Sequence, residues 1–357
     1  MMKSRATKAF GLLVMVGLCS GLVSLKSVPA QAAKADAANR QYHQAVALFG
    51  EGNYDGAAQA LRKAIEAQPN LAEAHHLLGL VYFQGKKQPM EAIESIKKAI
   101  QINPNFPQAY YDLGLIYQAQ GKGTDAEQAL KRAMELSPRY EEAQLALARL
   151  YERSRSTDKA VQAYRALLAI KSDHQGALYS LGYLLDIQGD SHQAREMLSR
   201  LVKVNQTHAD GWYLLGRIAE RENKLPEATE AYRTAIAVKP DLVDAHYNLA
   251  YVYRSEGKEE QAAREFLEVL RLKPEYAEAH MNLGLVYTGL GKFDEAENQY
   301  ETAIKLKPDM AEAHYNLGLL YELHKKDPIK ALAQYRKYLE LGGKDERVQR
   351  IVRQEGQ

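Results

Sequence analysis

Residues 277–308, AEAHMNLGLVYTGLGKFDEAENQYETAIKLKP, decide the fold, because a close copy follows as AEAHYNLGLLYELHKKDPIKALAQYRKYLELGG at residues 311–343. Weaker copies precede them, and the closing positions of all copies are 34 or 35 residues apart. These closing positions are Pro69, Pro104, Pro138, Ser172, Gln206, Pro240, Pro274, Pro308 and Gly343. A fixed period of this length predicts tandem units of two helices each, stacked so that neighbours bury one another's apolar faces.

The positions that recur within each copy are illustrated by Leu283, Gly284, Tyr287, Ala296 and Tyr300, followed by Ala303 and Pro308. In these positions the chain resembles the tetratricopeptide repeat family over about residues 38–343. The resemblance implies an all-α fold, an α-solenoid in which helix-turn-helix repeats form a right-handed superhelix. We expect nine repeats, at residues 38–71, 72–106, 107–140, 141–174, 175–208, 209–242, 243–276, 277–310 and 311–343.

Small residues and glycines explain how each hairpin closes. Gly284 and Ala296 are expected where the two helices of a hairpin cross, since a larger side chain would separate the backbones. Five glycines just past the first helix are expected to adopt a left-handed conformation: Gly52, Gly121, Gly189, Gly257 and Gly291. Repeats two and nine carry one extra residue in this turn, and Asp327 with Pro328 reads as an N-cap followed by the first helical turn.

The two ends differ from the repeats. Residues 1–32 combine Lys3, Arg5 and Lys8 with an apolar run and a small-residue stretch ending at Ala32, a pattern typical of a secretory signal peptide. We expect cleavage after Ala32 and a periplasmic protein, the alternative being an uncleaved segment that anchors the chain to the inner membrane. Residues 33–37 are expected to be a short linker, and the charged residues 344–357 a capping segment.

Charge and cysteine content exclude several classes of function. The formal net charge of +2 includes four bases and no acid within residues 1–32, so their removal leaves −2. A nearly neutral chain gives no reason to expect a nucleic acid partner. The single cysteine, Cys19, lies within the same segment, which leaves the remainder without a thiol for disulfides or metals.

No motif for catalysis is present in the sequence. There is no glycine-rich phosphate loop, no nucleophilic serine elbow and no HExxH helix, and the repeats occupy nearly the whole chain. His246, His280 and His314 recur at one repeat position, but helices that neighbour one another are about 10 Å apart, too far for three imidazoles to share a metal. We therefore predict no enzyme activity, no cofactor, no metal and no small-molecule substrate.

Candidate binding residues come from the resemblance, which implies that positions 5, 6, 9 and 13 of each first helix line the concave surface. Position 5 is unusually rich in tyrosine, and position 9 alternates arginine and tyrosine in repeats four to seven. Position 6 is asparagine in repeats seven to nine, and a primary amide can both donate to and accept from a peptide backbone. The predicted partner-binding residues are Tyr111, Tyr179, Tyr183, Tyr213, Arg217, Tyr247, Asn248, Tyr251, Asn282, Tyr315 and Asn316.

The predicted function is a non-catalytic scaffold in the cell envelope that binds an extended or helical segment of another exported protein. An alternative is a scaffold that guides an envelope polysaccharide, because tyrosine faces also stack on sugars. A structural interpretation stays open beside both: these side chains can pair with one another or with Glu152, Asp186 and Glu220, without any ligand.

Overall fold

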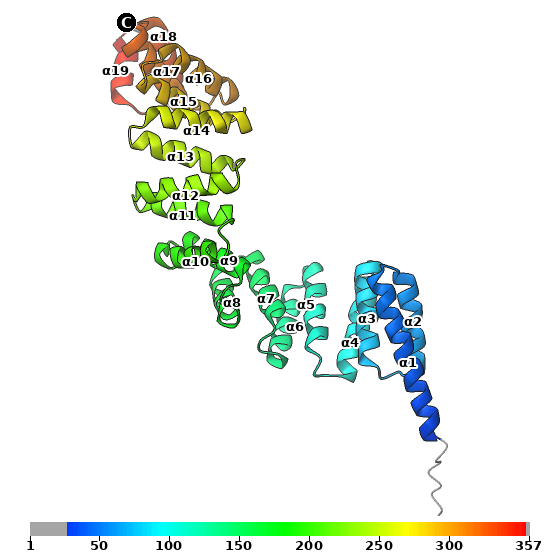
Figure 1. The fold of residues 1–357 in the computed structure, drawn as a ribbon. Coiled ribbons are helices and arrows are strands. Elements are labelled where there is room, and N and C mark those ends of the chain that lie inside the picture. Colours follow the sequence, from blue (N-terminus) through cyan, green and yellow to red (C-terminus); the bar gives the residue numbers. More distant parts are fainter. Residues whose placement is uncertain (1–26, 355–357) are drawn as a thin grey trace, which may run out of the picture. The chain divides into compact units, whose positions relative to one another are not determined.

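The computed structural model describes residues 27–354, and the regular elements of these residues are all helices. The chain divides into two units, residues 1–138 and 139–357. The first unit contains α1 (Ser27–Gly50), α2 (Tyr54–Ala67), α3 (Ala72–Leu80), a π-helical turn η1 (Val81–Gly85), α4 (Pro89–Ile102), α5 (Pro107–Ala119) and α6 (Gly123–Leu136) (Figure 1).

The second unit continues the same pattern of paired helices. It contains α7 (Glu141–Arg153), α8 (Thr157–Ile170), α9 (Gln175–Ile187), α10 (Ser191–Val204), α11 (Ala209–Arg221), α12 (Leu225–Val238), α13 (Val243–Ser255), α14 (Glu259–Leu272), α15 (Ala277–Gly289), α16 (Phe293–Leu306), α17 (Ala311–Leu319), η2 (Leu320–Lys325), α18 (Pro328–Glu340) and α19 (Glu346–Gln354).

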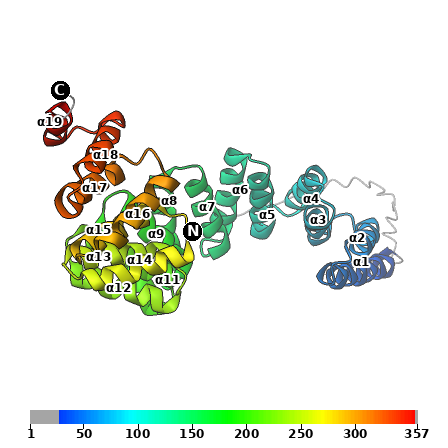
Figure 2. The same cartoon turned by 90° about the horizontal axis from the view of Figure 1, so that it is seen from above.

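Within the second unit, each first helix packs on the second helix of its own hairpin, which in turn contacts the next first helix. The first helix α11 also contacts α9 and α13, and α11 to α14 lie side by side in both views (Figure 1, Figure 2). First helices therefore share one side of the stack, which we name the first-helix face, and second helices form the second-helix face. The predicted all-α solenoid class is confirmed.

The helices of a hairpin approach closely at the predicted small residues. A Cβ atom added to Gly284 would lie 2.6 Å from Cε1 of Tyr300, and one added to Gly182 would lie 2.7 Å from Cγ of Leu198. Both Tyr300 and Leu198 are buried. The packed second-helix side chain thus needs the space that glycine leaves, which confirms the predicted crossing.

The turns between the helices of a hairpin follow the predicted chemistry. Gly189 and Gly291 have φ values of 84° and 72°, in the left-handed region that glycine adopts without strain. Arg155 and Asn223 hold the equivalent conformation in hairpins without a glycine there, with φ values of 55° and 58°. The second helix then begins at a capping residue, as where Asp190 accepts a 3.0 Å hydrogen bond from the backbone N–H of Gln193.

The extra residue of repeats two and nine is absorbed inside the first helix. In both repeats the helix ends in a π-helical turn, η1 or η2, whose wider i to i+5 hydrogen bonding accommodates one more residue. Asp327 then caps α18, accepting from the N–H of Lys330 at 3.0 Å, and Pro328 is the first helical residue. The sequence located the insertion and the cap but not the π-helical turn.

At the N-terminal end, residues 33–37 form part of α1 and are not a separate linker. Their alanine-rich sequence has a high intrinsic helix propensity, so the helix extends through them. Most of the predicted signal peptide, residues 1–26, lies outside the described residues. In the stretch that is described, residues 27–354, no helix is both long and apolar enough to cross a membrane.

At the C-terminal end, α19 packs on the last hairpin. Val348 is fully buried, and Ile351 and Val352 pack against the same core as Tyr335. Arg347 holds α19 in place through hydrogen bonds of 2.8 and 2.9 Å to the carboxylate of Glu322. The charged tail therefore covers apolar surface of α17 and α18 that a further hairpin would otherwise cover.

Candidate functional site

The position-5 tyrosines of the second unit are half-buried. The ring of Tyr247 stacks on Tyr276, with centroids 5.3 Å apart and planes 19° from parallel. Tyr179 lies 5.2 Å from the ring of His208, and Tyr315 lies 5.1 Å from Tyr338. Tyr276 and His208 are the N-caps of the next first helices, α15 and α11, so Tyr247 and Tyr179 join neighbouring hairpins, whereas Tyr315 packs on α18 of its own hairpin. Burial raises the pKa of all three hydroxyl groups.

Two further position-5 tyrosines fit this description in part. Tyr213 is half-buried, with its ring 5.9 Å from Tyr232, and burial raises its pKa. Tyr111 is half-buried on α5 in the first unit. The predicted tyrosine series is therefore present on the first helices, but in large part it serves as packing between and within hairpins.

The predicted asparagine series needs correction. Asn282 is only 6% exposed, and its amide donates to the hydroxyl of Tyr247 at 3.0 Å and to the carbonyl of Glu278 at 2.8 Å. Asn248 and Asn316 are half-buried, and their amides lie 3.3 Å from the Tyr232 hydroxyl and 3.6 Å from the Met281 sulfur. Because these amide donors already have partners in the protein, the three asparagines do not form an open row of peptide-binding groups.

Position 9 provides the accessible side chains of the first-helix face. We name Arg149, Tyr183, Arg217 and Tyr251, from α7, α9, α11 and α13, the position-9 row. Tyr183 and Tyr251 are 37% and 44% exposed, among the most exposed large apolar side chains of the described residues. Position 9 follows the small residue, glycine or alanine, at the crossing with the second helix, so its side chain points away from the hairpin core.

Neighbouring side chains support these rings from one side. Tyr183 lies nearly parallel to Tyr179, with centroids 6.4 Å apart, and the guanidinium of Arg254 lies 5.1 Å from the ring of Tyr251. Both contacts come from the same helix as the ring concerned. They orient the rings and leave much of each ring surface exposed.

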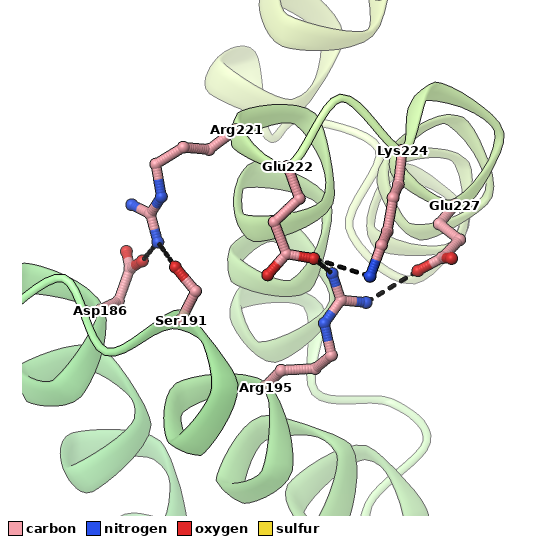
Figure 3. A network of polar contacts seen from close by, with 7 residues as sticks. All are labelled: Asp186, Ser191, Arg195, Arg221, Glu222, Lys224 and Glu227. Carbon is pink, nitrogen blue, oxygen red and sulfur yellow. Dashed lines mark hydrogen bonds and ion pairs between the residues drawn. The ribbon is translucent and has the colours of Figure 1, made fainter.

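Asp186, at the end of α9, connects the fifth repeat to the sixth (Figure 3). Its side chain is 2% exposed, and one of its oxygens accepts a hydrogen bond from Arg221 of α11. Arg221 also donates to the hydroxyl of Ser191 at 2.9 Å. Arg217 lies further from the carboxylate, at 3.7 Å, and its side chain is 40% exposed. A buried carboxylate thus holds Arg221 and leaves Arg217 largely accessible.

A second network beside it joins α10 to the turn between α11 and α12 (Figure 3). Arg195 lies 2.6 Å from Glu222 and 2.7 Å from Glu227, and Lys224 lies 2.9 Å from Glu222. The hydrogen bond from Lys224 is the main cause that lowers the pKa of Glu222. These paired charges connect repeats and neutralise one another, so they make no open site.

The sequence analysis missed a recurrent pair of a carboxylate and a tyrosine inside the hairpins. The hydroxyl of Tyr164 donates to Glu152 at 2.5 Å, that of Tyr232 donates to Glu220 at 2.6 Å, and Tyr335 bonds Glu322 in the same way. Burial, followed by this hydrogen bond, raises the pKa of each of the three tyrosines. The signal was available, because Glu152 precedes Tyr164, and Glu220 precedes Tyr232, by 12 residues.

Each recurrent histidine contacts the last turn of the preceding repeat and the second helix of its own repeat. Nε2 of His246 lies 3.1 Å from the carbonyl of Pro240, and its Nδ1 lies 2.6 Å from Glu265. His280 and His314 make the same two contacts, but a glutamine replaces the glutamate. Within residues 27–354, no three histidine, aspartate or glutamate side chains are grouped as metal ligands.

A hollow of about 500 Å³ lies between α10, α11 and α12 beside Trp212. Val202, Lys203 and Leu215 line it, and the indole N–H of Trp212 donates to the carbonyl of Gln206 at 2.9 Å. The hollow is open and contains no cluster of charged or catalytic groups.

Comparison with known protein families agrees with this geometry. Residues 45–85, 90–121, 220–254, 250–291 and 286–324 match a family model described as TPR repeat. Residues 111–175 and 176–208 match two models described as tetratricopeptide repeat. No curated protein sequence matches the chain.

Solved structures with the same fold include the C-terminal part of a TPR repeat-containing protein from Cytophaga hutchinsonii. It is 17% identical, has a TM-score of 0.59, and the match covers 67% of this chain and 97% of that one. PilF of Pseudomonas aeruginosa is 19% identical with a TM-score of 0.50, covering 61% and 99% of the two chains. YrrB, described as a TPR protein with an unusual peptide-binding site, is 19% identical with a TM-score of 0.49, covering 56% and 100%.

Proposed function

Since the chain belongs to the tetratricopeptide repeat family, whose repeats form protein-interaction scaffolds, we propose that it binds an extended segment of a partner protein on the first-helix face of its second unit. The scaffold is non-catalytic. The observation that carries this proposal is the exposure of Tyr183 and Tyr251 on either side of Arg217, on three first helices in succession.

The kind of partner follows from the shape and chemistry of the row. Tyrosine rings give large contact areas at a low cost in side-chain entropy, and they suit binding surfaces for that reason. Three helices whose axes are about 8–10 Å apart place the row along a line of roughly 20 Å. A chain of several residues can contact the whole line, whereas a small molecule would contact one helix pair only.

The proposal includes the cellular location of the protein. The bases, apolar run and small residues of residues 1–32 support export with cleavage after Ala32, and so a role in the cell envelope with an exported partner. Mass spectrometry of the protein from its native cells tests this. A chain that begins at Ala33 is expected, and an intact N-terminus in the membrane fraction would favour the anchored alternative.

Capture of the partner tests the binding surface. The double variant Tyr183→Ala with Tyr251→Ala is compared with Leu267→Ala and Leu306→Ala, which remove equally exposed apolar side chains from α14 and α16. Proteins captured from the native cells are identified by mass spectrometry. A partner lost with the tyrosine variant and kept with the leucine variant is expected.

The opposite pattern would move the site to the second-helix face. Capture of a glycan and no protein, again lost only with the tyrosine variant, would establish the polysaccharide alternative instead. The observation in favour of that alternative is the exposure of Tyr183 and Tyr251, because tyrosine faces also stack on sugars.

A further inference from the structure

Arginines accompany the exposed tyrosines on the first-helix face. Arg149 and Arg153 are exposed on α7, and the side chains of Arg217 and Arg221 on α11 are 40% and 44% exposed. Arg149 and Arg217 belong to the position-9 row, and the other two stand one helical turn further along their helices. The first-helix face of repeats four to six therefore presents guanidinium groups on both sides of Tyr183.

The carboxylates nearest the position-9 arginines are engaged within the protein. The side chain of Asp186 is buried, and Arg221 reaches it from α11 (Figure 3). Glu152 and Glu220 accept hydrogen bonds from the buried hydroxyl groups of Tyr164 and Tyr232. Asp210 and Asp244 are exposed in the first turns of α11 and α13, but beside the position-9 row itself the accessible charge is positive.

Of the two arginines on α11, Arg217 is the better placed to bind a ligand. Arg221 makes the hydrogen bond to Asp186, whereas the closest approach of Arg217 to that carboxylate is 3.7 Å, beyond hydrogen-bond distance. The guanidinium group of Arg217 therefore keeps N–H donors that can bind an incoming carboxylate. Two parallel N–H···O hydrogen bonds can form, a geometry that makes such pairs strong.

The spacing of the row defines the ligand further. First helices repeat about every 8–10 Å, and an extended segment in the polyproline II conformation rises about 3.1 Å per residue with three residues per turn. One repeat therefore corresponds to about three ligand residues, and every third side chain of the segment faces the row. The row alternates arginine, tyrosine, arginine and tyrosine from α7 to α13. From this we infer that the partner segment is extended and acidic, with a carboxylate and an apolar side chain alternating about every three residues.

This inference rests on the proposed function and names the chemistry of its ligand. The probe is a fluorescein-labelled peptide of ten residues, with glutamate at positions 1 and 7, phenylalanine at positions 4 and 10, and glycine, serine or threonine elsewhere. A matched peptide has glutamine at both glutamate positions. Fluorescence anisotropy with the full chain at about 50 mM NaCl gives the two affinities.

The glutamate peptide is expected to bind at least about tenfold more tightly than the glutamine peptide, because hydrogen bonds to charged groups are the stronger ones. The difference should shrink at about 300 mM NaCl, where exposed charges are screened. Arg217→Gln and Arg149→Gln should each remove most of it. Arg233→Gln, an exposed arginine on the second helix α12, should leave it unchanged.

Equal affinities for the two peptides, or no binding of either, would overturn the inference. So would a glutamate preference that survives in the double variant Arg149→Gln with Arg217→Gln, confirmed as folded by circular dichroism. In each of these cases the proposed function still stands if the captured partner depends on Tyr183 and Tyr251. The proposed function fails if capture of the partner does not depend on Tyr183 and Tyr251.

Discussion

The fifth and eighth hairpins differ in where their aromatic side chains lie. In the eighth, Tyr300 of the second helix is buried against Gly284, and the equivalents of the exposed groove positions are Met281 and Leu285, buried and half-buried. In the fifth, a leucine takes the place of Tyr300 in the core. The aromatic rings are instead Tyr179 and Tyr183, on the first-helix face.

The two hairpins also differ in how they connect to their neighbours. Thr288 of the eighth hairpin lies within hydrogen-bond distance, 3.2 Å, of the Tyr300 hydroxyl in the same hairpin. The equivalent Asp186 has no such hydroxyl opposite and pairs with arginines of the sixth hairpin. The eighth hairpin is close to the family pattern, and its polar side chain at this position finds its hydrogen-bond partner within the same hairpin. A hairpin that departs from the pattern leaves rings and guanidinium groups at the surface, where a partner can bind them.

The largest expected effect is a difference in stability between a variant of a core tyrosine and a variant of a surface tyrosine. Tyr300→Ala should lower the local stability of α15 and α16 by about 3–5 kcal/mol, the range found for removing a large buried aromatic side chain. Tyr183→Ala should change that of α9 and α10 by no more than about 0.5 kcal/mol. Amide hydrogen exchange measures both, since it reports each hairpin separately. Similar losses in the two variants would show that Tyr183 is a packing residue.

A smaller effect is expected at the connection between the fifth and sixth hairpins. Asp186→Asn removes the negative charge that Arg217 and Arg221 share, and should cost about 1–2 kcal/mol at low salt, because both arginines are partly screened by solvent. The cost should fall in about 1 M NaCl. Glu220→Gln is the control, since an amide oxygen can still accept from Tyr232. An equal cost in the control would contradict the account.

The asparagines should have unequal effects. Asn282→Ala removes two hydrogen bonds from a buried amide and should cost about 1 kcal/mol, whereas Asn248→Ala, half-buried with a longer contact, should cost less than about 0.5 kcal/mol. Thermal unfolding followed by circular dichroism gives the comparison. Weaker partner binding in a stable Asn282→Ala protein would restore the asparagine series as a binding feature.

The smallest effect is a pH dependence at His246. Its two partners, Glu265 and the carbonyl of Pro240, can both accept hydrogen bonds, so this geometry favours the ring with a proton on each nitrogen. The hydrogen bond to Glu265 raises the pKa of His246, with Glu268 adding to the effect. Its contribution to stability is therefore complete below the unfolded-state value of about 6.5 and is lost as the pH rises through the folded-state value.

Two variants test this sign. Wild type should be more stable than Glu265→Gln at about pH 5, and the difference should shrink toward about pH 9. Gln299→Glu, beside His280, should create the same pH dependence of stability in the eighth hairpin. An advantage of wild type over Glu265→Gln that grows with pH would contradict the assigned protonation.

The backbone could be predicted from the sequence because it depends on local rules. The 34-residue period located the hairpins, and positive φ at Gly189 and Gly291 follows from the need for a left-handed turn residue. The crossing at Gly284 follows from the size of the side chain opposite. The π-helical turns could not be predicted, because an added residue can enter either a loop or a helix.

The candidate site was predictable only in part. The position of a residue within the repeat predicts which face of the helix its side chain occupies. The burial of that side chain depends on the residues of the neighbouring repeat. Asn282 is buried because the Tyr247 hydroxyl reaches it from the preceding repeat, and the period alone does not contain that contact. Position 9 stays open in Tyr183 and Tyr251 because it follows the crossing residue and points away from the hairpin core.

Site-specific photocrosslinking tests the central claim most directly. The photoreactive residue p-benzoylphenylalanine replaces Tyr183 or Tyr251 on the first-helix face, and Leu267, which is 46% exposed on the second helix α14, as the control. After irradiation of the native cells, adducts are identified by mass spectrometry. We predict one partner protein crosslinked at positions 183 and 251 and absent at 267. Adducts confined to position 267 would place the binding surface on the second helices and contradict the account.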